Sequence, residues 1–175
     1  MALNVKYFFI TLLFGSIVAA VLLKPFETIK VKKENIPQLK FVSFESFEIT
    51  KKGVESIGFG SEALKYEKRL TIKFPKFMRQ TKKGIETVSA NNGVIVEDSY
   101  VRLYDFVELS RDDNLTIKSS KMLYDMKTKL YSTEGNRFEA YYGKNVVTGE
   151  SLKYYQKSGK IFADKIYAKI FEEDR

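Results

Sequence analysis

The sequence predicts an all-β domain of antiparallel strands that follows one apolar N-terminal segment. From Phe41 onward, apolar and polar residues alternate over short runs, and no window of comparable length shows the 3.6-residue period of an amphipathic helix. Turn-forming pairs such as Asn92-Gly93 and Ser158-Gly159 separate these runs at short intervals. A repeated segment near the C-terminus is a third indication, because it has the outline of a hairpin that occurs twice.

The first element is an uncharged apolar run at residues 7–23. As a helix it would be roughly 25 Å long at ~1.5 Å per residue, the short end of what crosses a hydrocarbon core. Because the run is apolar on every face, it favours a transmembrane anchor over a buried core helix. A cleaved signal peptide is the alternative, since Val18 and Ala20 have small side chains suited to cleavage. We expect residues 1–6 to be a cytoplasmic tail.

Residues 24–40 form a charged linker that contains Pro25 and Pro37. The distribution of lysines conflicts with a cytoplasmic tail: Lys6 precedes the apolar run, whereas four lysines follow it within residues 24–33. By the positive-inside rule this count favours a cytoplasmic C-terminal domain, although a long domain is translocated largely regardless of charge. The linker leads into the predicted β-domain, residues 41–175.

The β-domain is built from short segments whose apolar residues recur at every second position, as expected of strands with one buried face. The alternating residues are Phe47 and Ile49; Leu70, Ile72 and Phe74; Val101, Leu103 and Val107; Leu115 and Ile117; Phe138, Ala140 and Tyr142; and Ile166, Ala168 and Ile170.

Composition argues against several kinds of chemistry. The chain has no His and no Cys, which excludes disulfides, thiolate zinc sites, histidine-based triads and thiol nucleophiles. The carboxylate pairs Glu97-Asp98 and Asp112-Asp113 point to opposite faces of a strand or lie in a turn, and no glycine-rich phosphate loop is present. We therefore predict a protein that is not an enzyme and that uses no metal and no cofactor.

The formal net charge of +8 is spread among interleaved Lys and Glu residues, which is typical of a solvated surface. Nucleic acid is a poor candidate partner because the apolar run would hold the domain at a membrane and the tyrosines do not cluster with arginines. One modification motif is present, an N-glycosylation sequon at Asn114 in a predicted turn, whose occupancy stays open.

The repeat near the C-terminus aligns at an offset of 31 residues, and each copy reads as a strand, a polar turn and a returning strand. The aligned pairs are Ser120 with Ser151, Tyr124 with Tyr155, Lys129 with Lys160, Leu130 with Ile161, and Tyr131 with Phe162. A hairpin unit of this length is expected in a stacked β-structure, in which each unit buries its apolar edge on the next.

These features together resemble the LptC family, the membrane-tethered component of the lipopolysaccharide-transport bridge. The resemblance rests on the layout of anchor, linker and β-domain and on SEALKYEKRLTIKFP (61–75), LTIKSSKMLYDMKTKLYSTEG (115–135) and GESLKYYQKSGKIFADKIYAKI (149–170). Residues 79–110 match no family pattern. The resemblance implies a twisted open β-jellyroll whose apolar interior holds the acyl chains of lipopolysaccharide. It also implies an inner-membrane, single-pass protein with its domain in the periplasm.

The inward positions of the strands are then the candidates for lipid contact, although the same residues would also form an ordinary closed core. They are Leu70, Ile72, Phe74, Val101, Leu103, Leu115, Ile117, Phe138, Ala140, Ile166, Ala168 and Ile170. Lys153, Lys157 and Lys165 are candidates for headgroup phosphates or for plain solvated charge.

The resemblance also implies partners. The strand near residues 41–49 would receive lipopolysaccharide from the inner-membrane Lpt ABC transporter. The C-terminal strand would pair with the periplasmic bridge protein LptA through Lys160, Ile161, Phe162, Ala163, Asp164, Lys165, Ile166, Tyr167, Ala168, Lys169 and Ile170. The alternative is a membrane-anchored β-domain with a closed core that only scaffolds a partner.

Overall fold

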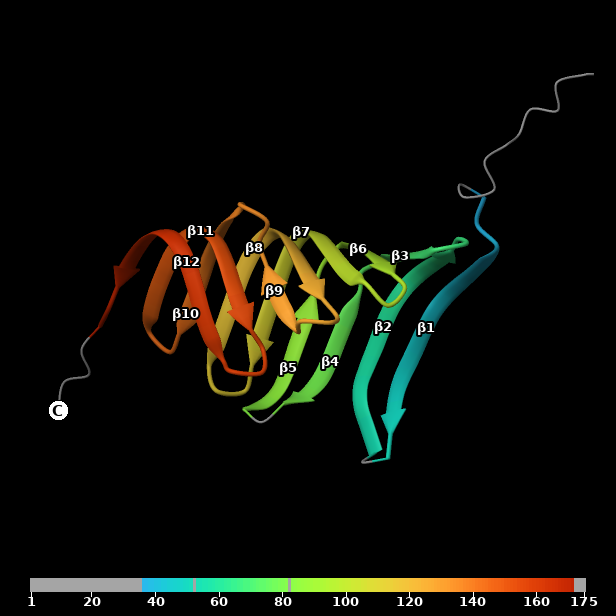
Figure 1. Cartoon of the computed structure of the whole chain (residues 1–175), viewed down its shortest axis with the longest axis horizontal. Helices are drawn as coiled ribbons and strands as arrows, with labels where there is room; N and C mark the ends of the chain where they lie inside the picture. The colour runs from blue at the N-terminus through green and yellow to red at the C-terminus, as the bar shows by residue number, and fades with distance from the viewer. Residues whose placement is uncertain (1–35, 52, 82, 172–175) are drawn as a thin grey trace, which may run out of the picture. The chain divides into compact units, whose positions relative to one another are not determined.

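The computed structural model describes residues 36–51, 53–81 and 83–171, all within one compact unit, Glu34–Arg175. These residues form twelve β-strands (Figure 1), and the predicted anchor and most of the predicted linker lie outside them. The strands are β1 (Leu39–Thr50), β2 (Gly53–Lys65), β3 (Arg69–Lys73), β4 (Lys76–Thr81), β5 (Gly84–Ser89), β6 (Asn92–Val96), β7 (Tyr100–Arg111), β8 (Leu115–Asp125), β9 (Leu130–Ser132), β10 (Arg137–Tyr142), β11 (Asn145–Tyr155) and β12 (Lys160–Lys169).

All strand pairs are antiparallel and belong to one sheet, so the predicted all-β class is confirmed for the described residues. The short strands combine end to end: β3 and β4 both pair with β2, β5 and β6 both pair with β7, and β9 and β10 both pair with β8 and with β11. The sheet is thus a meander of long strands. Within the described ranges no helix is long and apolar enough to cross a membrane.

Most of the long strands, with β3–β4 and β9–β10 counted as one strand each, have an irregular backbone near their middle. Residues with positive φ mark these irregularities at Ser43, Phe74, Asp105, Phe106, Glu134, Ser151 and Lys165. The β7–β8 ladder also shifts its register between Tyr104 and Val107. Such irregularities interrupt the ladder and bend the strand, and here they recur from strand to strand, so the whole sheet folds along one line.

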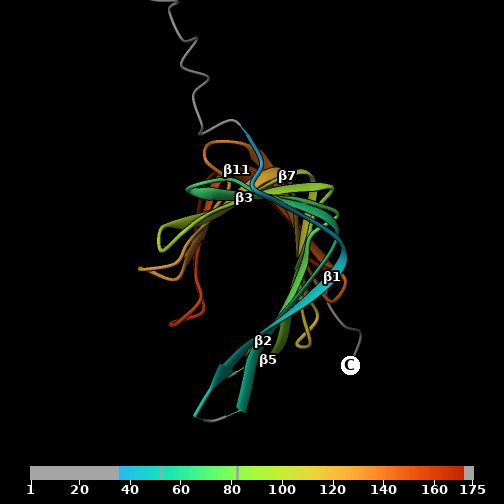
Figure 2. The same ribbon diagram turned by 90° about the vertical axis from the view of Figure 1, so that its right-hand side faces the viewer.

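The bends divide the sheet into two arms that curve around a common interior (Figure 2). We call the first the β3 arm; it contains β3, β6, β9 and the adjoining halves of the long strands. The second, the β4 arm, contains β4, β5, β10 and the other halves. Side chains that alternate inward from both arms face each other, so the arrangement is an open roll with one inner surface.

The hairpins repeat at a regular interval along this roll. At the tips of the β4 arm, the pairs that close successive hairpins begin at Thr50, Thr81, Arg111 and Tyr142, which are 30 or 31 residues apart. The repeat noticed in the sequence is therefore one up-and-down unit of the meander.

The register of the predicted repeat is wrong by one residue. Tyr124 pairs with Tyr131 across the β8–β9 hairpin, and Tyr154 pairs with Ile161 across the β11–β12 hairpin, so equivalent positions are 30 residues apart. A slip of one residue moves a side chain to the opposite face of a strand. The alignment of Tyr124 with Tyr155 accordingly joined a buried residue to one on the outer surface.

Candidate functional site

The middle of the interior is filled by apolar side chains. Leu109 and Ile117 of the β4 arm and Met122 and Leu152 of the β3 arm are all at most 1% exposed. They belong to one core cluster with Val88, Ala90, Leu103, Val107, Leu115, Tyr124, Tyr131, Phe138, Ala140 and Tyr154. Because native interiors are close-packed, this part of the roll is a sealed core rather than an open channel.

On the open side of the roll, polar side chains join the two arms over this core. The Glu86 carboxylate, 1% exposed on β5, accepts hydrogen bonds from the Tyr131 hydroxyl at 3.0 Å, the Tyr154 hydroxyl at 3.0 Å and the Gln156 amide at 2.6 Å. The rings of Tyr131 and Tyr154 are stacked, with centroids 5.8 Å apart. All three donors come from the β3 arm, whereas Glu86 belongs to the β4 arm.

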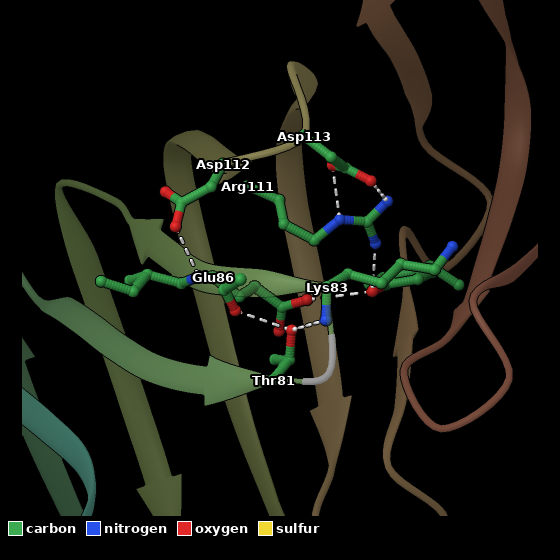
Figure 3. Close-up of polar contacts among 9 residues, drawn as sticks. Thr81, Lys83, Glu86, Arg111, Asp112 and Asp113 are labelled. Carbon is green, nitrogen blue, oxygen red and sulfur yellow. Dashed lines mark hydrogen bonds and ion pairs between the residues drawn. The ribbon is translucent and has the colours of Figure 1, made fainter.

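Two arginines of the β4 arm extend these contacts. Arg111 donates to the Tyr154 hydroxyl at 2.7 Å and forms a two-pronged pair with Asp113 (Figure 3). Arg79 donates to the Tyr124 hydroxyl at 2.6 Å. We refer to Glu86, Arg79 and Arg111 together with Tyr124, Tyr131, Tyr154 and Gln156 as the tyrosine clasp.

The pKa values of the groups in and beside the clasp determine which of them donate and which accept hydrogen bonds. Burial, and then the neighbouring Glu86 carboxylate, raise the pKa of Tyr154 to about 12. The same two causes raise the pKa of Tyr131 well above its usual value. Hydrogen bonding to Arg111 lowers the pKa of Asp113. At neutral pH the two tyrosines are therefore neutral donors to Glu86, and Asp113 is a carboxylate acceptor for Arg111.

A pocket of about 430 Å³ opens on the C-terminal side of the clasp, within the size range of ligand sites. Its walls are mainly apolar and come from β8, β10, β11 and β12. They consist of Leu115, Phe138, Ala140, Val147, Ile161, Ala163 and Ile166 with the aromatic Tyr141 and Tyr142, and Lys83, Arg111 and Asp113 complete the lining. Because Asp113 compensates the charge of Arg111, Lys83 is the cation that gives the lining a net positive charge. The site is suited to an apolar chain with a negatively charged group near Lys83.

The turn between β4 and β5 sets the position of Lys83 beside this pocket. Thr81 accepts a hydrogen bond from the Lys83 backbone N–H, and Asp112 of the next turn accepts one from the Ile85 backbone N–H at 2.7 Å (Figure 3). The Lys83 side chain reaches the opposite arm, because a Cβ built on Gly159 would lie 2.6 Å from its Nζ. The tips of the two arms therefore touch at the entrance of the pocket.

The candidate lipid-contact residues fall into three groups. Leu115, Phe138, Ala140 and Ile166 line the pocket. Ile72, Leu103 and Ile117 are buried, and Leu70 and Val101 are partly buried. Phe74, Ala168 and Ile170 are exposed and do not line this pocket.

Phe74 shows why the alternation ends where it does. Its φ is positive and its side chain is 61% exposed, while the next residue, Pro75, is buried. The bend between β3 and β4 shifts the alternation of inward-facing side chains by one residue. Residues that continue the pattern of β3 past the bend therefore point outward.

The predicted partner strand is an outermost strand of the sheet. Lys160–Lys169 form β12, which pairs with β11 alone, and Ile170 follows it. Phe162, Ile166 and Tyr167 are more than half exposed. At the other end of the roll, β1 pairs with β2 alone and exposes Leu39, Val42, Phe47 and Ile49 to a similar degree (Figure 1).

The three lysines predicted as candidates for headgroup phosphates do not line the pocket. Lys153 and Lys157 are exposed away from it, and Lys165 is paired with Glu150 at 2.8 Å. The two cations at the pocket, Lys83 and Arg111, were not predicted. Asn114 is exposed in the turn between β7 and β8. No group of acidic, His or Cys residues in the described part of the chain is arranged to hold a metal ion.

The sequence matches the family described as "Lipopolysaccharide-assembly, LptC-related" over residues 8–174. The chain belongs to this family. Membership connects the chain with lipopolysaccharide transport, and the match also includes most of the N-terminal segment that the structure does not describe. Curated protein sequences give no match to this LptC-family chain.

Among solved structures, the LptC-family chain is similar to LptH from Pseudomonas aeruginosa, described as the LptA homologous periplasmic component of the conserved lipopolysaccharide transport device. The two are 9% identical with a TM-score of 0.42, and the match covers 80% of this chain and 99% of that one.

Proposed function

We propose that the protein is a non-enzymatic carrier in lipopolysaccharide transport. In this proposal it is held at the inner membrane by its N-terminal segment, with the roll in the periplasm. It receives lipopolysaccharide from the inner-membrane ABC transporter at the β1 end. It passes the lipid to the bridge protein LptA at the β12 end.

The observation that carries this proposal is the position of the apolar pocket directly beside an unpaired edge strand. Ile161 and Ile166 of β12 line the pocket, while Phe162 and Tyr167 of the same strand are exposed. An added strand from LptA would pair with this edge and extend the apolar surface into the next protein. A lipid could then move on without its acyl chains entering water.

The energetic value of such continuity is large. Moving one acyl chain of about a dozen carbons into water costs on the order of 10 kcal/mol at ~0.8 kcal/mol per CH₂. An apolar surface that continues from one protein to the next removes most of this barrier without any chemical step. The exposed apolar residues of β1 and β12 also support a carrier that pairs with neighbouring proteins. Apolar edge strands promote aggregation when they stay unpaired, so we expect partner strands to cover them.

One observation favours a second candidate function, an adaptor that only scaffolds partner proteins. Leu109, Ile117, Met122 and Leu152 fill the middle of the roll as they would in an ordinary closed core. In an adaptor the two edges would still bind neighbours, but no lipid would enter the pocket.

In-cell photo-crosslinking distinguishes the two functions. A photoreactive phenylalanine analogue in place of Tyr142 or Ile166 lies on the pocket wall, whereas the same analogue in place of Tyr155 lies on the outer surface. The carrier function predicts lipopolysaccharide adducts at the first two positions and none at the third. Absence of adducts at both pocket positions in a folded protein contradicts the carrier and favours the adaptor.

A further inference from the structure

The tyrosine clasp connects the two arms through hydrogen bonds between side chains. The backbone pairings of the short strands, in contrast, lie within one arm or the other. Glu86 joins the β4 arm to three groups of the β3 arm, and Arg111 adds a second bond to one of them, the Tyr154 hydroxyl. Arg79 joins the arm to one further hydroxyl, that of Tyr124. Glu86 and the rings of Tyr131 and Tyr154 are buried, so water competes little for these bonds. The clasp therefore holds the two arms together on the side of the roll where no strand pairing joins them.

The clasp also lies between the two ends of the roll. Its β4-arm members come from β4, β5 and β7. The pocket is lined mainly by strands that follow β7, together with Lys83, Arg111 and Asp113. On the β1 side, the interior surface continues through Ala63 and Ile72, which are both buried. A chain that enters near β1 therefore meets the clasp and the packed core before it reaches the pocket.

We infer that the tyrosine clasp is a gate on the lipid route: the arms part at the clasp to let an acyl chain pass toward β12 and close again behind it. This inference rests on the proposed carrier function. The interior is too well filled for a chain to pass while the clasp is closed, because the four central core residues are almost completely buried.

The construction of the clasp is suited to reversible opening. Its bonds are side-chain bonds, so parting the arms leaves every strand ladder intact. The groups that would be released are hydroxyls, an amide, a carboxylate and guanidinium groups, all of which water can solvate once the open side is wet. If apolar side chains joined the arms at this place instead, opening would expose their apolar surface to water, which is unfavourable.

The gate is tested by locking the arm tips in the full-length chain. The chain has no native Cys, so Lys83→Cys with Ser158→Cys gives two thiols at the touching tips of the arms. A short membrane-permeant bis-maleimide joins them in intact cells. The photoreactive analogue at Tyr142 then reports whether newly made lipopolysaccharide reaches the pocket. As a matched control, Ser132→Cys with Lys153→Cys links paired neighbours within the β3 arm.

The gate predicts that linking the Lys83/Ser158 variant lowers its Tyr142 adduct at least about tenfold relative to the same variant before linking. Linking the control pair is expected to leave the adduct of the control variant unchanged. An undiminished adduct in the locked protein overturns the gate and leaves the carrier function standing. Absence of the adduct even in the unlinked proteins overturns both, because no lipid then reaches the pocket by any route.

A second variant addresses the clasp itself rather than the arm tips. Tyr154→Phe keeps the buried ring but removes the hydroxyl that bonds Glu86 and Arg111. The gate predicts that the Tyr142 adduct forms several-fold faster in this variant. A rate equal to that of the parent protein contradicts a gating role for the clasp.

Discussion

The β8–β9 and β11–β12 hairpins are the same unit, 30 residues apart, in two different surroundings. In the first, Tyr131 lies on β9, which pairs with β8 on one side and β11 on the other, and is 7% exposed. In the second, the equivalent Ile161 lies on the outermost strand β12, is 42% exposed and lines the pocket. The difference comes from neighbours rather than from the hairpins themselves. A unit that forms core inside a meander forms a binding surface where the meander ends.

Stability and function are therefore expected to separate along the roll. The middle, with its sealed core and its clasp, supplies most of the free energy of folding. The last strand, β12, contributes little stability but forms one wall of an apolar pocket and offers an unpaired edge. Substitutions in the two regions test this separation.

The largest effect is expected from core truncation. Leu152→Ala leaves a cavity beneath the clasp and is expected to lower the free energy of unfolding by about 3–5 kcal/mol. Ile161→Ala on the neighbouring strand removes partly exposed atoms and is expected to cost about 1 kcal/mol or less. Chemical denaturation of the two purified variants measures both, and equal losses would show that the end of the roll is as well packed as its middle.

A smaller effect is expected from alkaline pH. The folded-state pKa of Tyr154 is raised to about 12, above its unfolded value, so its contribution is complete below about pH 10 and is lost as the pH rises toward 12. The two-unit shift corresponds to roughly 2–3 kcal/mol. Unfolding free energies measured from pH 9 to 12 should fall less steeply in Tyr154→Phe than in the parent chain. Parallel curves would mean that the clasp hydroxyl does not contribute.

The smallest effect on stability is expected at the edge. Tyr167 on β12 is 71% exposed, so Tyr167→Asp should change the free energy of unfolding by no more than about 0.5 kcal/mol. Its charge would nevertheless face an added strand, and co-purification of the bridge protein LptA with the chain should be lost. Retained co-purification would place the partner surface elsewhere.

The all-β class and much of the interior could be predicted because alternation is a local property of each strand. Leu103, Leu115 and Ile117 were placed inward by pattern alone, and the structure buries them. Alternation carries no information across a bend, however, and the positive φ at Phe74 reverses the phase that the preceding residues had set. Similar residues at an offset of 31 likewise concealed the offset of 30 that relates the β8–β9 and β11–β12 hairpins.

The clasp could not be predicted, because it depends on contacts between residues far apart in the chain. Glu86 shares one face of its strand with Val88 and Ala90, but a Glu side chain is ordinarily exposed, and residues 79–110 match no family pattern. The one available signal was Tyr124, Tyr131 and Tyr154 themselves, since a buried tyrosine hydroxyl needs a hydrogen-bond partner.

Hydrogen–deuterium exchange on the full-length chain, with and without lipopolysaccharide, tests most directly the claim that the roll is sealed in its middle and holds lipid in the pocket at its C-terminal end. Without lipid, the amides of β8 and β9 should exchange much more slowly than those of β12. Adding lipopolysaccharide should increase protection in β10, β12, the start of β11 and the Leu115 end of β8, and leave the second half of β8 and β9 unchanged. Protection gained mainly in β8 and β9, or in no strand at all, would contradict the account.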